Sequence, residues 1–120
     1  MSMRIYEIAD PVWSQRVLGD DTLVWIDTEK LRASWENDRY GYFDGNDHPN
    51  AIKNRIDRFG EWIKQGIPIQ APEVSLSDDG HVIFTNGRHR FVWMLQHGIQ
   101  SLPVAVTPVY VDEITKRFGR

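Results

Sequence analysis

Short apolar runs bounded by turn residues recur along the 120-residue chain. Four of these runs are β-prone and predict strands: Leu23–Ile26, Val74–Leu76, His81–Phe84 and Leu102–Val106. The run Asp78-Asp79-Gly80 separates the middle two and predicts a β-hairpin. Pro103 predicts an early position in its strand or an edge strand, because proline cannot donate to a ladder.

Helical spacing predicts three helices. Between Pro49 and Gln65, apolar residues recur at steps of four, three and four, at Ile52, Ile56, Phe59 and Ile63. A second helix is predicted from about Gly87 to His97, with Phe91, Val92, Met94 and Leu95 buried and Gly98 as its left-handed cap. Val111–Phe118 is predicted to form a short closing helix.

The segment 32–50 is rich in Asp, Asn, Gly and aromatic residues, which predicts a long loop. The resulting order of strand, helix, hairpin, helix and strand is typical of an α+β fold. We therefore expect residues 1–120 to form one compact domain, with a small mixed sheet and helices packed around it.

Composition narrows the functional class. The chain is 41% hydrophobic and 26% charged, which argues against a disordered chain or a coiled coil. It has no cysteine, so disulfides and thiolate chemistry are excluded. No signal peptide or membrane span is apparent, and we expect a cytoplasmic protein. A net charge of −3 disfavours DNA binding through overall charge and leaves a local basic patch open.

One segment carries candidate chemistry, Asn86-Gly87-Arg88-His89-Arg90, between a predicted strand and a predicted helix. A helix start presents unpaired N–H groups, Gly87 allows close approach of a ligand, and the arginines offer forked donors. These features together are typical of a phosphate site. The alternative is that Asn86 caps the helix while the arginines pair with surface carboxylates. The spacing of the histidines and of the acids at 44–47 predicts no metal site.

A larger ordered set of motifs suggests a family. It comprises Gly66-Ile67-Pro68, Asp79-Gly80, Gly87-Arg88-His89-Arg90 and the Gly98 to Leu102-Pro103-Val104 ending. The set resembles the domain shared by ParB partition proteins and sulfiredoxins, over roughly residues 52–106, with a weaker fit at Leu23–Asp27.

The resemblance implies nucleotide binding, of ATP or CTP with Mg²⁺. Gly87, His89 and Arg90 match the phosphate-contacting positions of the Gly-x-His-Arg form. Arg88 stands where sulfiredoxins have the catalytic Cys and ParB proteins have Glu. Sulfinic-acid reduction is therefore excluded. The departure at Arg88 argues against the CTP-clamp chemistry of ParB proteins and leaves the binding of ATP or CTP open. Asn86 stands where some small kinases have an acid, and an amide cannot act as a general base.

Small stand-alone members of this fold resemble plasmid fertility-inhibition factors, which have been linked to ATPase and nuclease activity. The leading hypothesis is a nucleotide-binding domain with a phosphate site at Asn86–Arg90, acting in plasmid or phage-type DNA maintenance or interference. Weak NTP hydrolysis would need an acid from elsewhere, with Asp27, Glu29 or the 44–47 segment as candidates. Which nucleotide binds, whether it is hydrolysed and the oligomeric state stay open.

Two other functions are considered. One is a non-catalytic protein-interaction module that uses Trp35, Tyr40, Tyr42 and Phe43, although burial of these aromatics in the core is favoured. The other is a metal-dependent nuclease, for which the acids show no recognisable spacing.

Overall fold

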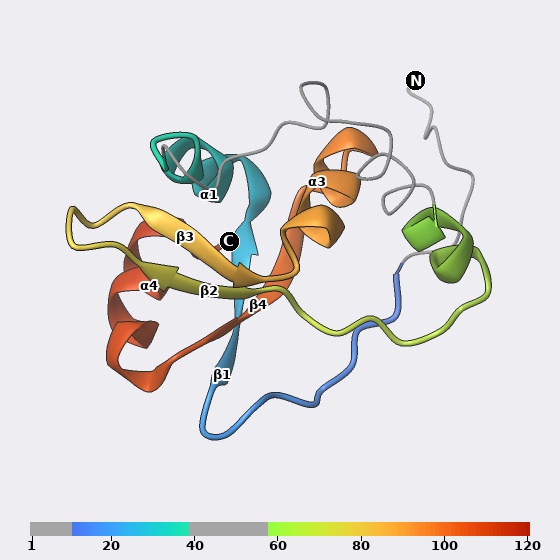
Figure 1. The fold of residues 1–120 in the computed structure, drawn as a ribbon, viewed down its shortest axis with the longest axis horizontal. Coiled ribbons are helices and arrows are strands. Elements are labelled where there is room, and N and C mark those ends of the chain that lie inside the picture. The colour runs from blue at the N-terminus through green and yellow to red at the C-terminus, as the bar shows by residue number, and fades with distance from the viewer. Residues whose placement is uncertain (1–10, 39–57) are drawn as a thin grey trace.

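The computed structural model describes residues 11–38 and 58–120. A small mixed sheet lies among several helices, which confirms the predicted α+β class (Figure 1). In chain order the elements are β1 (Thr22–Asp27), α1 (Thr28–Trp35), a helical segment at 58–64, β2 (Glu73–Leu76), β3 (Val82–Asn86), α3 (Arg88–Gln96), β4 (Ser101–Val106), the short 3₁₀ helix η1 (Pro108–Tyr110) and α4 (Val111–Phe118).

All four predicted strands are present, in the order β1-β4-β2-β3. β4 pairs antiparallel with β1 and parallel with β2, while β2 and β3 form the predicted hairpin. Gly80 in the hairpin turn has φ +82°, a conformation that favours glycine. The next five residues of β4 after Ser101 are all buried, so this strand lies at the centre of the sheet.

The edge position considered for Pro103 is wrong, and the backbone geometry explains why proline is tolerated there. Pro103 lies opposite Trp25 of β1, whereas β2 joins β4 only from Ala105 onward. The amide of Ala105 donates to the Pro72 carbonyl on the β2 side at 2.8 Å. Residues two apart point the same way along a strand, so the nitrogen of Pro103 faces away from β1. The missing N–H therefore costs no bond to β1.

Helix α1 was not predicted from the sequence, and the expected loop at 32–50 is wrong over its first residues, because they belong to this helix as far as Trp35. Asp27 caps this helix, and its carboxylate accepts a 3.0 Å hydrogen bond from the amide of Lys30. Leu31 and Trp35, one turn apart, are both fully buried. The Trp35 ring meets Phe84 edge-on at 4.5 Å, so the predicted burial of this aromatic is confirmed. Residues 39–50, with Tyr40, Tyr42 and Phe43, lie outside the described residues.

The other helices agree with the sequence pattern where the structure describes them. α3 buries Phe91, Val92 and Met94 as predicted, Leu95 is half-buried, and Gly98 after it has φ +73°. α4 has the predicted bounds. The predicted helix at 49–65 is confirmed for 58–64, and its earlier part lies outside the described residues.

The helix at 58–64 packs closely on α3. A Cβ atom at Gly60 would lie 2.8 Å from the indole nitrogen of Trp93, closer than real side chains approach. Phe59 meets the same Trp93 ring edge-on at 5.8 Å. Gly60, which weakens the helix by propensity, is thus explained by this close approach. The two helices therefore hold a fixed position relative to one another.

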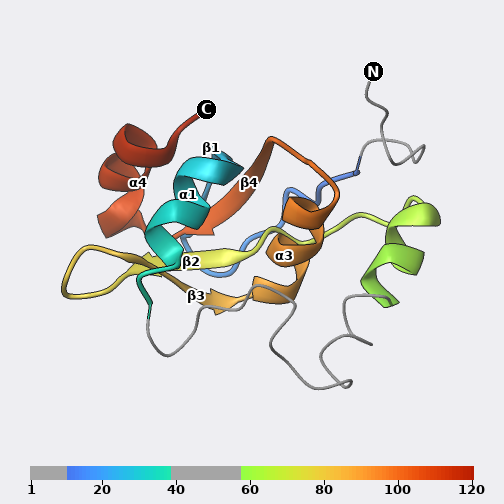
Figure 2. The same ribbon diagram turned by 90° about the horizontal axis from the view of Figure 1, so that it is seen from above.

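Two views show where the helices lie relative to the sheet and to one another (Figure 1 and Figure 2). In Figure 1, α1 and α3 lie above β2 and β3, and the segment 58–64 lies at the right-hand end beyond α3. Viewed from above in Figure 2, α1 and α4 are together at one end and 58–64 is at the other. Within residues 11–38 and 58–120, no helix is long and apolar enough to cross a membrane.

Candidate functional site

The start of α3 is built by Gly87, which takes the N-cap position with φ +84°. No side chain caps this helix, and its first turn contains no acidic residue. Arg88, His89 and Arg90 occupy that turn instead. The start of a helix carries the positive end of the helix dipole, so this end is electropositive and cations placed there are unfavourable unless an anion is present. The first turn therefore has the electrostatics of an anion site.

Arg90 folds back over the backbone of Gly87. A Cβ atom at Gly87 would lie 2.9 Å from the Arg90 guanidinium carbon and 2.8 Å from Cα of Pro72. The Nε and Nη2 atoms of Arg90 are buried, and neither has a hydrogen-bond partner in the part of the chain that the structure describes. Burial lowers the pKa of Arg90, although the guanidinium stays charged. Two charged donors of Arg90 are therefore available for a hydrogen-bond acceptor that the described residues do not supply.

Glu73, the first residue of β2, is the acid whose charge acts on this arginine. It pairs in register with Asn86, and a β-bulge separates it from Val74. Its charge raises the pKa of Arg90, against the larger effect of burial. The Oε2 atom of Glu73 is buried and has no hydrogen-bond partner among the described residues. Glu73 thus attracts Arg90 without occupying its Nε and Nη2 donors. Bulges often redirect a side chain beside an active site.

A cleft of about 700 Å³ opens beside Arg90, a volume in the range of small-molecule sites. It combines basic, polar and aromatic side chains from three parts of the chain. Its lining consists of Ser14, Arg16, Phe59, Trp62, Pro68, Ile69, Gln70, His89 and Arg90. Two backbone hydrogen bonds of 2.8 Å attach the segment 12–14 to Ile69. The amide of Ser14 donates to the carbonyl of Ile69, and the amide of Ile69 donates to the carbonyl of Val12. This attachment brings Arg16 to the cleft.

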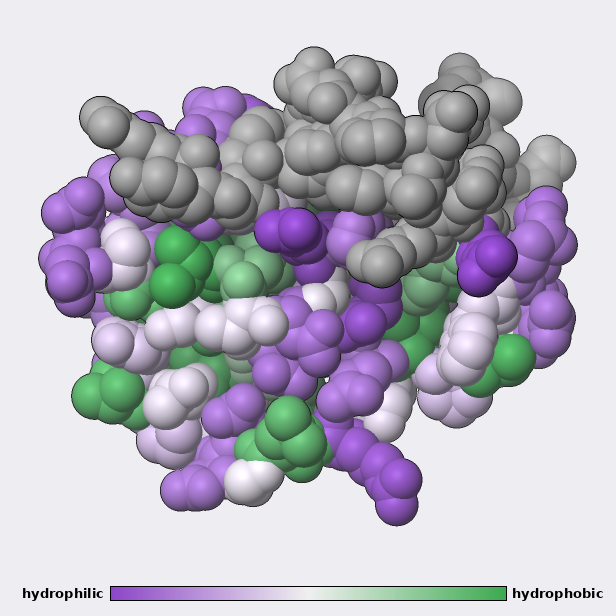
Figure 3. Space-filling view, in the orientation of Figure 1, coloured by the Kyte–Doolittle hydropathy of each residue, from purple (hydrophilic) through white to green (hydrophobic). Residues whose placement is uncertain are grey.

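A smaller hollow of about 240 Å³ also lies at the α3 start, lined by Phe84, Thr85, Asn86, Gly87, Arg88 and His89. His89 lines both hollows, so both border the first turn of the helix. In Figure 3 hydrophobic surface lies next to strongly hydrophilic side chains between α3 and the segment 58–64. A ligand with an apolar part and an anionic part fits such a surface.

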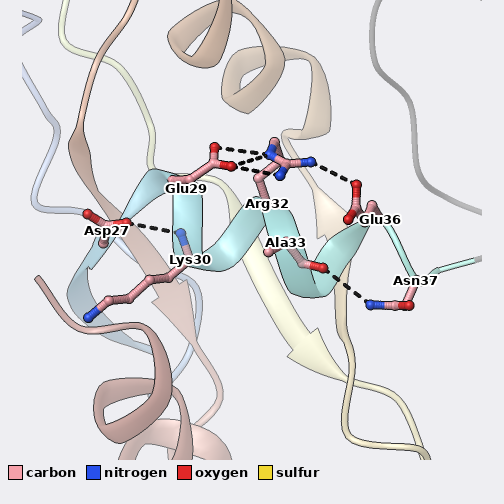
Figure 4. Close-up of polar contacts among 7 residues, drawn as sticks. All are labelled: Asp27, Glu29, Lys30, Arg32, Ala33, Glu36 and Asn37. Atoms are coloured by element: carbon pink, nitrogen blue, oxygen red, sulfur yellow. Dashed lines mark hydrogen bonds and ion pairs between the residues drawn. The ribbon is translucent and has the colours of Figure 1, made fainter.

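The structure brings together all five predicted site residues, Asn86 to Arg90, around the two hollows. It does not place the candidate acids there. Asp27 caps α1, and Glu29 forms a charged network with Arg32 and Glu36 on the surface of that helix (Figure 4). Residues 44–47 lie outside the described residues.

Sequence reasoning missed several residues of this site, namely Arg16, Trp62, Gln70 and Glu73. For Trp62 the sequence contains one indication: it is an aromatic residue on a helix whose apolar face is formed by Phe59 and Ile63. For Glu73 it contains none, because the effect of its charge on Arg90 depends on the pairing of β2 with β3. In the described ranges, no three His, Asp or Glu side chains group as a metal site would require.

Comparison with known proteins gives two matches. The model of the plasmid fertility inhibition factor family matches residues 23–119. The chain is also similar to the crystal structure of an oncogenic suppression activity protein, a plasmid fertility inhibition factor, in its gold(I) cyanide derivative. That likeness has a TM-score of 0.63 at 21% identity and covers 82% of this chain and 57% of the other, so it shows the fold alone. No curated protein matches the chain.

Proposed function

Because the chain belongs to the plasmid fertility inhibition factor family, we propose that it binds a nucleotide, ATP or CTP, in a plasmid-related role. The phosphates lie at the start of α3, against the backbone N–H groups after Gly87 and the side chains of His89 and Arg90. The remainder of the nucleotide lies in the larger cleft. Interference with the transfer or maintenance of other DNA is the biological role that fits this family.

One observation carries the proposal. Arg90 keeps two buried guanidinium donors without a hydrogen-bond partner among the described residues, at a helix start that no side chain caps. A buried donor without a partner costs about 1–3 kcal/mol and more when it is charged. A phosphate oxygen removes that cost and is also favoured by the helix dipole. An anionic ligand is therefore the simplest explanation for this arrangement.

Calorimetric titration with inorganic tripolyphosphate, ATP and CTP tests the proposal, with and without Mg²⁺. We expect micromolar binding by the wild type and a loss of at least about 100-fold in Arg90→Ala, which lacks two charge-assisted bonds. The matched control is Arg32→Ala, because Arg32 bonds to Glu29 and Glu36 on α1. Equal affinity in the two variants, or no binding of any polyphosphate at millimolar concentration, would contradict the proposal.

Slow hydrolysis is a further part of the same proposal. Mg²⁺ is commonly held by one or two carboxylates together with phosphate oxygens, and Glu73 is the acid beside Arg90. Bound there, Mg²⁺ would neutralise charge on the phosphates. A phosphate-release assay on the wild type and Glu73→Gln tests this part. A signal that persists unchanged in the variant would show that Glu73 takes no part in hydrolysis.

A protein-interaction module is the second candidate, and one observation favours it. The Trp62 side chain is 48% exposed at the rim of the larger cleft, and exposed tryptophans often anchor interfaces. Limited proteolysis with and without nucleotide separates the two functions. Protection of the cleft by nucleotide supports the ligand site, whereas unchanged cleavage together with absence of binding supports the interaction module.

A further inference from the structure

Two aromatic rings, those of Phe59 and Trp62, line the larger cleft whose other lining includes Arg90 and His89. We propose that these rings form a platform on which the planar base of the ligand stacks. The inference rests on the proposed phosphate site, which fixes one end of the ligand, and it assigns the other end. It also concerns selectivity. Stacking raises the affinity for ligands that carry an aromatic base, and it discriminates only weakly between different bases.

The platform is rigidly attached to the phosphate site. Phe59 meets Trp93 edge-on at 5.8 Å with the ring planes at 88°, and Gly60 lets the helix approach the same indole. Trp93 lies three residues after Arg90 on α3, so both belong to neighbouring positions of one helix surface. This helix–helix contact therefore positions the Phe59 ring relative to the helix that carries Arg90. Such preorganisation reduces the entropy lost on binding.

Trp62 differs from the other exposed tryptophan of the described residues, Trp25. Trp25 is 37% exposed on β1, and the guanidinium of Arg120 covers its ring at 4.1 Å from the centroid. Trp62 is 48% exposed and lines a cleft. A large apolar ring in a cleft gains from being covered by another flat ring, and base–aromatic stacking supplies that cover. Trp25 thus serves as an internal comparison for Trp62.

The rest of the lining agrees with an amphipathic ligand. Pro68 and Ile69 extend the apolar wall, while Ser14, Arg16 and Gln70 add polar groups around it. The volume of about 700 Å³ exceeds what a phosphate alone needs. We therefore expect ATP and CTP to bind with affinities within about tenfold of each other, and both to bind more tightly than inorganic tripolyphosphate.

The test compares tripolyphosphate, ATP and CTP on the wild type, Trp62→Ala, Trp62→Phe and the control Trp25→Ala. We expect Trp62→Ala to weaken both nucleotides by about tenfold or more and to leave tripolyphosphate unchanged. Trp62→Phe should retain most of the nucleotide affinity, because it keeps a ring, and Trp25→Ala should have no effect. Circular dichroism checks that each variant is folded.

The outcomes separate this inference from the proposed function. If tripolyphosphate binds through Arg90 but Trp62→Ala leaves ATP and CTP unchanged, the platform is wrong and the phosphate site stands. An equal loss for tripolyphosphate and nucleotides in Trp62→Ala also overturns the platform, because the change then acts on the phosphate end. If Arg90→Ala leaves tripolyphosphate binding intact, the phosphate site itself fails.

Discussion

The N-termini of α1 and α3 differ in their capping residue and in the charge of their first turn. α1 begins with Asp27, whose carboxylate accepts from the amide of Lys30, and has Glu29 in its first turn. α3 begins with Gly87 and has neither a capping side chain nor an acid there. An ordinary helix start gains from acidic residues, so α1 is optimised for stability. α3 gives up the same stabilisation and retains an electropositive start.

The arginines of the two helices show the same contrast. Arg32 of α1 makes three hydrogen bonds to Glu29, from 2.7 to 3.0 Å, and one of 2.8 Å to Glu36 (Figure 4). Arg90 of α3 is half-buried with two donors that no described residue accepts. Both residues carry a positive charge, so charge alone does not separate them. The unused hydrogen-bonding capacity of Arg90 is the difference on which the proposed binding role rests.

The largest expected effect comes from giving α3 an ordinary residue at its start. Gly87→Ala places a Cβ against the Arg90 guanidinium and 2.8 Å from Cα of Pro72, at a positive φ. We expect a loss of about 2 kcal/mol or more in unfolding free energy, from backbone strain and from steric overlap with main chain. Binding of tripolyphosphate should also fall, because Arg90 must move. Denaturant unfolding and calorimetry measure the two effects.

Gly19→Ala is the matched control for this change. Gly19 also has a positive φ, +56°, but a Cβ there would meet nothing within 4 Å. We expect it to lose only the backbone cost of about 1 kcal/mol, with unchanged binding. If the two variants lose the same stability, the close approach at Gly87 contributes nothing and the contrast with α1 rests on charge alone.

The second effect concerns the charge of Glu73 that acts on Arg90. Glu73→Gln keeps the shape of the side chain and removes the attraction that partly compensates the half-buried guanidinium. We expect a loss of about 1 kcal/mol in stability without ligand, less than for a fully buried pair because both residues are partly exposed. Affinity for tripolyphosphate without Mg²⁺ should rise several-fold, since the negative charge of Glu73 no longer repels the phosphate. A fall in Mg²⁺-free affinity would contradict this role.

A smaller effect is expected from exchanging the charges of the two first turns. Arg88→Glu introduces into α3 the acid that α1 already has, and we expect a gain of about 0.5 kcal/mol in unfolding free energy. Glu29→Arg makes the reverse change in α1 and should destabilise it, since the bonds to Arg32 are also lost. Thermal unfolding ranks the two variants. Loss of stability in Arg88→Glu would show that the start of α3 is not electropositive.

The accuracy of the sequence-based fold prediction differs between local and long-range features. The strands and the hairpin turn were predicted because they depend on short apolar runs and on turn residues such as Gly80. Helix α1 was not predicted at all, because the polar and aromatic composition from Arg32 onward was interpreted as loop. The central position of β4 depends on partners far apart in the chain, so Pro103 alone could not predict it.

The candidate site shows the same limit. Asn86 to Arg90 form a local motif, and the sequence was sufficient to place them at a helix start. Arg16 and Glu73 reach the site through the pairing of 12–14 with Ile69 and of β2 with β3. Neither contact has a signature within a few residues of the side chain concerned. Nucleotide binding at this site stays a prediction, and so does the resemblance to ParB proteins and sulfiredoxins.

The smallest effect is the pH dependence that α1 should show through Glu29. Hydrogen bonds from Arg32 lower the pKa of this exposed carboxyl. A group with a lowered pKa in the folded state contributes stability above its unfolded pKa and loses it as the pH falls through the folded value. We therefore expect Glu29→Gln to be slightly less stable than the wild type at neutral pH, with the difference shrinking as the pH falls through the lowered pKa of Glu29.

The measurement is urea unfolding of the wild type and Glu29→Gln between about pH 7 and pH 3, repeated in an Arg32→Ala background. Without Arg32 the hydrogen bonds to Glu29 are absent, so the substitution should have almost no effect on stability at any pH. A persistent difference in that background would assign the contribution of Glu29 to the dipole of α1 instead. The hydrogen bonds of Arg32 would then stabilise α1 less than their geometry indicates. The difference between α1 and α3 would lie mainly in the charge at the two helix starts, and less in the hydrogen bonding of Arg32 and Arg90.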